Sequence, residues 1–117
     1  MDENCIFCKI IKGEIPSNKV YEDEYVLAFK DLHPVTPVHV LIIPKIHIQD
    51  LEHVDETNSV YTQKCQEAFK KVASECGVAE SGYRVICNCG EDGGQEVKHL
   101  HYHLLGGQKL GTKIVHE

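Results

Sequence analysis

Three histidines alternate with apolar or aromatic residues in the stretch "HLHYHLL", residues 99–105. If this stretch is a strand, its side chains alternate between two faces, so the histidines share one face at a spacing of about 6.5–7 Å. Two kinds of chemistry use such an array. One is metal binding, with a further ligand from elsewhere in the chain. The other is nucleophilic catalysis, in which one imidazole attacks while its neighbours orient it and carry protons. The three histidines are His99, His101 and His103.

The preceding segment, "GEDGGQEV", is rich in glycine. Gly90, Gly93 and Gly94 permit positive φ angles and let backbone N–H groups approach an anion closely. Asn88 and Gln95 could add side-chain donors. The plain alternative is a hairpin turn without a ligand, but its position directly before the histidines favours a phosphate site.

The remaining pattern predicts an α+β fold in which an antiparallel sheet carries one long amphipathic helix. The long helix is expected from about Asp55, its N-cap, to Cys76, with Gly77 as the stop signal. A short helix is expected near the N-terminus. The expected strands are two within residues 19–32 around the turn "EDE", one at 39–44, and two near 83–90 and 98–107.

Bulk properties limit the classes of function. The chain has 117 residues, enough for one domain, and a formal net charge of -6. This charge, without a basic stripe, argues against nonspecific binding to nucleic acid or membranes. The first residues do not resemble a signal peptide, so the six cysteines are expected to be intracellular thiols or metal ligands rather than disulfides.

The segments "IFCKIIKGEIPSNKVYEDEYVLAFKDLHPVTPVHVLIIPKIHI" and "NCGEDGGQEVKHLHYHLLGG" resemble the histidine-triad nucleotide-binding (Hint) branch of the histidine-triad superfamily. Only the tail, residues 108–117, matches weakly. The resemblance implies that residues 1–117 form a single domain. It also implies a five-stranded antiparallel sheet with a long and a short helix, joined to a second sheet in a homodimer of ten strands.

The same resemblance implies a nucleotide-hydrolysing site. His101 would attack the α-phosphorus of a purine nucleoside 5′-phosphoramidate and form a nucleotidyl-histidine, which water cleaves to AMP. His39, His99 and His103 would complete the catalytic set, and no catalytic cofactor is implied. Asp31 would bind the ribose hydroxyls. The base would lie among Ile6, Phe7, Ile10, Phe29 and Leu32, and the phosphate among Asn88, Gly94, Gln95, Glu96, Val97 and His103.

One position departs from the family pattern. Many members carry serine or threonine where this chain has Glu96. That hydroxyl is often assigned to helping the leaving group depart. Glutamate brings a negative charge near an anionic phosphate, so the group that protonates the leaving amine stays open.

A second metal question concerns Cys5 and Cys8, which form a C-x-x-C pair. The pair could be half of a zinc site, a redox pair, or two small core residues. The resemblance implies a structural zinc ion bound by this pair together with His47 and His99. His99 would then serve the metal, whereas His101 serves the chemistry.

Two other functions remain open on the sequence. One is a non-catalytic nucleotide-binding regulatory or scaffold protein, although such a protein has no need of a nucleophile. The other is a zinc hydrolase with the triad around a catalytic ion. In each case the expected ligand is a purine nucleoside monophosphate or its derivative.

Overall fold

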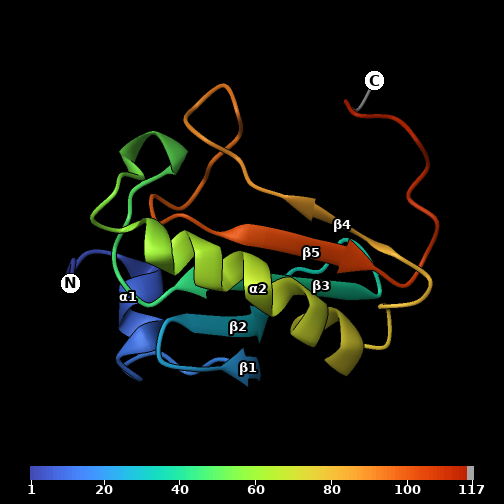
Figure 1. Ribbon diagram of the computed structural model, residues 1–117, viewed down its shortest axis with the longest axis horizontal. Helices are drawn as coiled ribbons and strands as arrows, with labels where there is room; N and C mark the ends of the chain where they lie inside the picture. The colour runs from blue at the N-terminus through green and yellow to red at the C-terminus, as the bar shows by residue number, and fades with distance from the viewer. Residues whose placement is uncertain (116–117) are drawn as a thin grey trace.

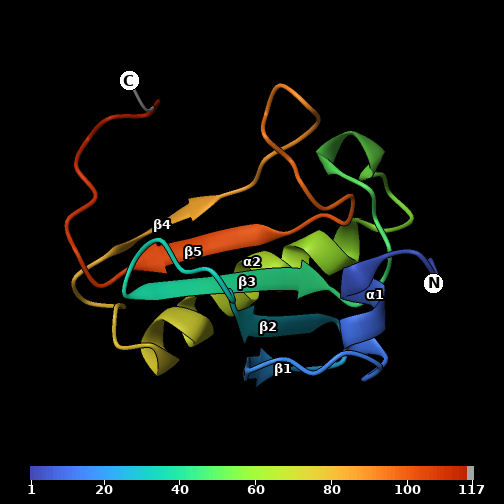
Figure 2. The ribbon, with the colours of Figure 1, turned by 180° about the vertical axis from the view of Figure 1, so that it is seen from behind.

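The computed structural model describes residues 1–115 and contains one five-stranded antiparallel sheet with the strand order β1-β2-β3-β5-β4 (Figure 1). The helix α2 crosses one face of this sheet, and α1 lies on the opposite face, near the C-terminal end of β3 (Figure 2). The strands are β1 (Lys19–Glu22), β2 (Val26–Lys30), β3 (Val38–Pro44), β4 (Tyr83–Ile86) and β5 (Tyr102–Gly106). The helices are α1 (Ile6–Ile11), the 3-10 helix η1 (Leu51–His53) and α2 (Ser59–Glu75). This architecture confirms the predicted fold class.

The central strands are apolar on both faces because each face is covered. Along β2 and β3, alternate side chains enter two separate clusters. Val40 and Ile42 pack with α2, whereas Leu41 and Ile43 pack with α1 on the other face. This explains why residues 38–43 read as a nearly continuous apolar run.

The helix α2 buries one stripe, formed by Cys65, Ala68, Val72 and Ala73. These spacings place the four side chains on one helical face. The helix ends as predicted, because Gly77 takes a φ of 74° and its N–H donates to the carbonyl of Ser74. The predicted N-cap was wrong. Asn58 occupies that position, while the Asp55 carboxylate accepts hydrogen bonds from the N–H and hydroxyl of Thr57 in the preceding turn.

The last two strands are shorter than predicted. β4 ends at Ile86, and β5 begins only at Tyr102, so of the triad only His103 lies within the ladder. The reason is that other groups hold the preceding residues. The Leu100 N–H donates to the carbonyl of Ile48 at 2.7 Å, and His99 Nε2 donates to the carbonyl of Pro44 at 3.1 Å. The predicted alternation nevertheless persists, since Leu100, Tyr102 and Leu104 all enter the cluster under α2.

Of the helices in the part of the chain that the structure describes, none is long and apolar enough to cross a membrane.

Candidate active site

His101 is buried and oriented by its own chain. Its side chain is 6% exposed, and its Nδ1 lies 2.7 Å from the carbonyl oxygen of His99. A carbonyl only accepts hydrogen bonds, so Nδ1 carries the hydrogen and Nε2 keeps a free lone pair. Burial lowers the pKa of His101, which favours the neutral ring at pH 7. A neutral imidazole with a free Nε2 is a competent nucleophile.

His39 and His103 form a hydrogen-bonded pair with a defined proton arrangement. The N–H of Val35 donates to His39 Nδ1 at 3.2 Å, so in the neutral ring the hydrogen of His39 is on Nε2. That Nε2 lies 2.9 Å from Nδ1 of His103 and donates to it. Burial first, then the neighbouring His101 and His39, lower the pKa of His103 to about 4. Neutral His103 therefore carries its hydrogen on Nε2, as a donor.

Aromatic contacts hold these rings together. The ring centroids of His101 and His103 are 5.1 Å apart. Phe7, from α1, packs edge-on against His101 with centroids 5.2 Å apart and planes at 85°. Phe29, from β2, packs edge-on against Phe7. The short N-terminal helix thus places its buried aromatic ring directly against the candidate nucleophile.

The residues predicted to bind the nucleoside separate into buried and exposed groups. Phe7, Ile10 and Phe29 are buried in one cluster with α1, whereas Ile6 is half exposed and Leu32 is 82% exposed. Asp31 follows β2, and its Oδ1 accepts a hydrogen bond from the N–H of His33 at 2.8 Å. Its Oδ2 lies 3.4 Å from His39 Nε2. The carboxylate therefore adjoins the histidines, and in the predicted base slot the two exposed residues would lie at the rim.

The loop between β4 and β5 offers backbone donors. Among the described residues, none accepts a hydrogen bond from the N–H of Glu96 or Val97. Gly94 has a φ of 80°, in the left-handed region. Successive free N–H groups in such a turn can bind an anion. Asn88 is half-buried in the same loop.

The side chain of Gln95 behaves differently from the sequence prediction. Its Nε2 donates to the carbonyls of Gln49 and Val97 at 2.8 and 3.0 Å. Both amide hydrogens are used within the protein, so this side chain has none left for a phosphate. Glu96 is exposed, and its carboxylate raises the pKa of His101, opposing the larger effect of burial.

Replacing Gly93 by alanine is expected to distort this loop. A Cβ at position 93 would overlap the carbonyl oxygen of Cys89, a contact that only a backbone shift relieves. Gly93→Ala should therefore weaken AMP binding about tenfold or more while leaving the sheet intact. Calorimetric titration with AMP measures the effect, and Gly111→Ala, at a glycine in the tail, is the control. Unchanged affinity would exclude this loop from the phosphate site.

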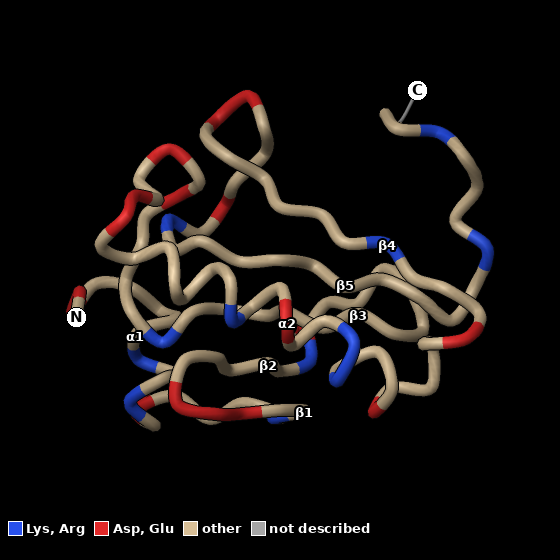
Figure 3. Tube along the Cα trace, viewed as in Figure 1, with Lys and Arg blue, Asp and Glu red and all other residues tan. Residues whose placement is uncertain are grey.

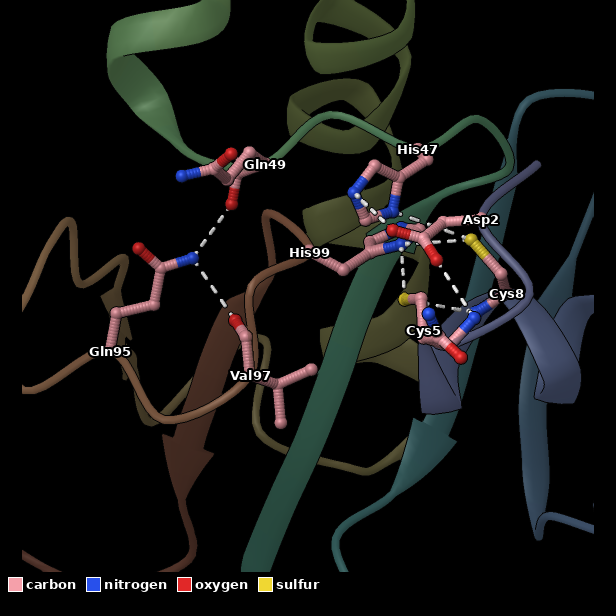
Figure 4. Close-up of polar contacts among 9 residues, drawn as sticks. Asp2, Cys5, Cys8, His47, Gln49, Gln95, Val97 and His99 are labelled. Carbon is pink, nitrogen blue, oxygen red and sulfur yellow. Dashed lines mark hydrogen bonds and ion pairs between the residues drawn. The ribbon is translucent and has the colours of Figure 1, made fainter.

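A separate cluster joins α1 to the triad segment. One ligand atom from each of Cys5, Cys8, His47 and His99 lies within 4.8 Å of all the others (Figure 4). His99 Nδ1 is 3.3 Å from Cys5 Sγ and 3.6 Å from Cys8 Sγ, and His47 Nδ1 is 3.4 Å from Cys8 Sγ. A tetrahedral zinc ion with ordinary Zn–S and Zn–N bonds requires sulfur–nitrogen distances of about 3.5 Å. The four residues fit that ion.

The surroundings of the cluster also suit a metal. His99 is fully buried, and its Nε2–H donates to the carbonyl of Pro44, which leaves Nδ1 facing the sulfurs. Burial and a hydrogen bond with Cys5 raise the pKa of the Cys8 thiol to about 11. A bound dication reverses that direction, because a ligating thiol loses its proton. Asp2, which the sequence did not single out, lies 3.7 Å from Nε2 of His47.

Comparison with known proteins gives a consistent result. Residues 12–110 match the model of the HIT domain. The purine nucleoside phosphoramidase of Escherichia coli K12 is 45% identical over 117 residues, covering 100% of this chain and 98% of that protein. A HIT family hydrolase from Clostridium thermocellum superposes with a TM-score of 0.95 at 55% identity, covering 98% of this chain and 100% of that one. A histidine triad protein from Clostridium difficile superposes with a TM-score of 0.92 at 51% identity, covering 97% of this chain and 98% of that one.

Proposed function

The chain belongs to the HIT domain family, and on that premise we propose that it hydrolyses purine nucleoside phosphoramidates through a covalent nucleotidyl-histidine. The observation that carries the proposal is the hydrogen bond from His101 Nδ1 to the carbonyl of His99, which leaves a neutral Nε2 as nucleophile. The named activity of the E. coli relative supports the same reaction class. Substrates would include adenosine 5′-phosphoramidate and AMP-lysine.

The proposed reaction has two steps. In the first, His101 Nε2 forms a bond to the α-phosphorus, the P–N bond breaks, and the amine leaves with one proton taken from solvent. The hydrogen bond from Nδ1 to His99 stabilises the positive charge that develops on the ring. In the second step, water forms a bond to phosphorus, the bond from phosphorus to His101 Nε2 breaks, AMP leaves, and one proton of the water returns to solvent. The Nε2–H of His103 and the free N–H groups of Glu96 and Val97 are the donors for the phosphate oxygens.

The test is AMP release from adenosine 5′-phosphoramidate by the purified protein, with and without a chelator. Release that persists without metal supports the proposal. Release that stops when the metal is removed, from protein that remains folded, favours a zinc hydrolase. Tight AMP binding without any turnover favours a nucleotide-binding regulatory protein.

Asp31→Asn is expected to lower kcat/KM for ribonucleotide substrates by about 10- to 100-fold, because hydrogen bonds to a charged acceptor contribute about 1.5–3 kcal/mol. A 2′,3′-dideoxy substrate lacks both hydroxyls, so wild type and variant should hydrolyse it at similar rates. Steady-state kinetics on the two substrates checks this. An equal loss on both would show that Asp31 acts through His39 instead, which lies 3.4 Å away.

We propose that the Cys2His2 cluster holds a structural zinc ion that fixes α1 against the triad segment. The ion would be bound by Cys5, Cys8, His47 and His99, and it would take no part in the two chemical steps. The fit of their sulfur–nitrogen distances to a tetrahedron supports this assignment.

We also propose a homodimer that joins two sheets, with α2 and an edge strand at the interface. β1 and β4 end the sheet, so the outer edge of each is unpaired within the described chain. Light scattering on the protein as it elutes from a size-exclusion column measures the mass of the assembly.

A cytoplasmic location is proposed on the six cysteines, all of which are free thiols in the structure.

A further inference from the structure

Gln95 links the loop before the triad to a distant part of the chain. Its Oε1 accepts a hydrogen bond from the N–H of Gly90 at 2.9 Å. Its Nε2 donates to the carbonyls of Gln49 and Val97 at 2.8 and 3.0 Å (Figure 4). A primary amide has two N–H donors, and both are used here. The side chain is therefore a link within the protein rather than a free donor.

The segment at the other end of this link is itself fixed. Gln49 follows β3, between Ile48 and Asp50, which are both buried. The carbonyl of Ile48 accepts the N–H of Leu100 at 2.7 Å. Gln95 thus ties an otherwise irregular loop to a segment that already holds the triad in place.

The free backbone donors lie between the points that Gln95 fixes. Gly90 is held at one end of the turn by both the side chain and the N–H of Gln95. At the other end, the carbonyl of Val97 accepts from Gln95, and the Val97 side chain packs against the cluster that contains Phe7. The peptide between Glu96 and Val97 is therefore restrained on both sides. Donors that are fixed before a ligand binds need no ordering at the moment of reaction.

We propose that Gln95 is a positioning residue: it holds the N–H groups of Glu96 and Val97 toward the α-phosphate oxygens without touching the substrate. This inference rests on the proposed function and deepens it, because it assigns transition-state stabilisation to the backbone of the loop. It replaces the direct phosphate contact that the sequence predicts for this glutamine.

The decisive variant is Gln95→Glu, which has the same size but no N–H donors. Its carboxylate still accepts from Gly90, but it faces the carbonyl oxygens of Gln49 and Val97 with nothing to donate. Gln49→Glu is the matched control. It makes the same chemical change at an exposed side chain, and it keeps the backbone carbonyl to which Gln95 donates. Gln95→Ala, which adds no charge, is the second variant.

Two measurements are made on each protein. The first is the backbone order parameter of the Glu96 and Val97 amides by NMR relaxation, without any ligand. The second is kcat and KM for adenosine 5′-phosphoramidate. In both Gln95 variants we expect these order parameters to fall from the range of rigid backbone, about 0.85, to below about 0.6, kcat to fall by about 10- to 100-fold, and KM to change by less than about threefold. The control should match wild type in both measurements, and all melting temperatures should agree within a few degrees.

Other results would overturn the inference. Unchanged order parameters with lost turnover would mean that the Gln95 amide contacts the substrate directly. Lower order parameters with normal turnover would mean that the order of the loop is irrelevant to the reaction. If the wild-type protein releases no AMP, the proposed function fails, and AMP affinity replaces turnover as the readout. Weaker AMP binding in both Gln95 variants with lower order parameters would then support the positioning role, and unchanged binding would overturn it.

Discussion

His101→Ala is expected to reduce AMP release from adenosine 5′-phosphoramidate by at least about 10³-fold, because removing a covalent nucleophile removes the whole pathway through the intermediate. The residual rate would come from binding and the loop donors alone. The change deletes a buried ring that packs on Phe7 and His103, so the folded state must be confirmed by its melting temperature. AMP should still bind, since Asp31 and the loop remain.

A rapid-quench reaction near neutral pH, read by intact mass and peptide mapping, measures the intermediate. Wild type should show a transient adduct of AMP mass on the peptide that contains His101. The variant should show none. His53→Ala is the control, since that imidazole is 57% exposed and pairs with Asp50 on η1. An adduct on any other residue, or an unchanged rate in His101→Ala, would contradict the assignment.

Cys8→Ser is expected to abolish stoichiometric metal binding and to lower the melting temperature by at least about 10 °C. The physical reason is mass action: a ligand present at 1,000 times its dissociation constant stabilises the native state by about 4 kcal/mol. In a domain of this size, each kcal/mol shifts the melting temperature by roughly 3–6 °C. Loss of one thiolate ligand removes most of that stabilisation.

The measurement combines metal analysis of the purified protein with thermal melting, each with and without a chelator. Wild type should contain one zinc ion per chain and should melt lower when chelated. Cys8→Ser should contain none, and the chelator should not change its melting temperature. Cys76→Ser is the control, because that half-buried cysteine lies at the end of α2, outside the cluster. A chelator-sensitive Cys8→Ser variant would contradict the proposed ligand set.

Much of this molecule was predictable from local pattern. The alternation of His99, His101 and His103 with apolar residues placed two sets of side chains on opposite faces, and the structure keeps that separation even where the ladder is absent. The apolar run of β3 and the stripe on α2 predicted buried elements correctly. The C-x-x-C pair alone left three interpretations open, and only the resemblance to a family brought in the two histidines.

Other features depend on contacts between distant segments. The start of β5 could not be predicted, because it depends on bonds from residues 99 and 100 to Pro44 and Ile48. The same holds for Gln95, whose partner Gln49 lies 46 residues earlier. The N-cap of α2 differs from the prediction for a local reason. Asp55 and Asn58 are both residue types that cap helices, and Asp55 caps the turn before the helix instead.

The order of the proposed zinc ligands along the chain has a consequence for biosynthesis. Cys5 and its partner His99 are separated by 94 positions. At translation rates of about 5–20 residues per second, the ribosome makes His99 about 5–19 s after Cys5. The helix α1 is synthesised first, but its link to His99 can form only after nearly the whole chain has been made. During that interval its two thiols are exposed to the metal and redox buffers of the cell, before the fold can select what they bind.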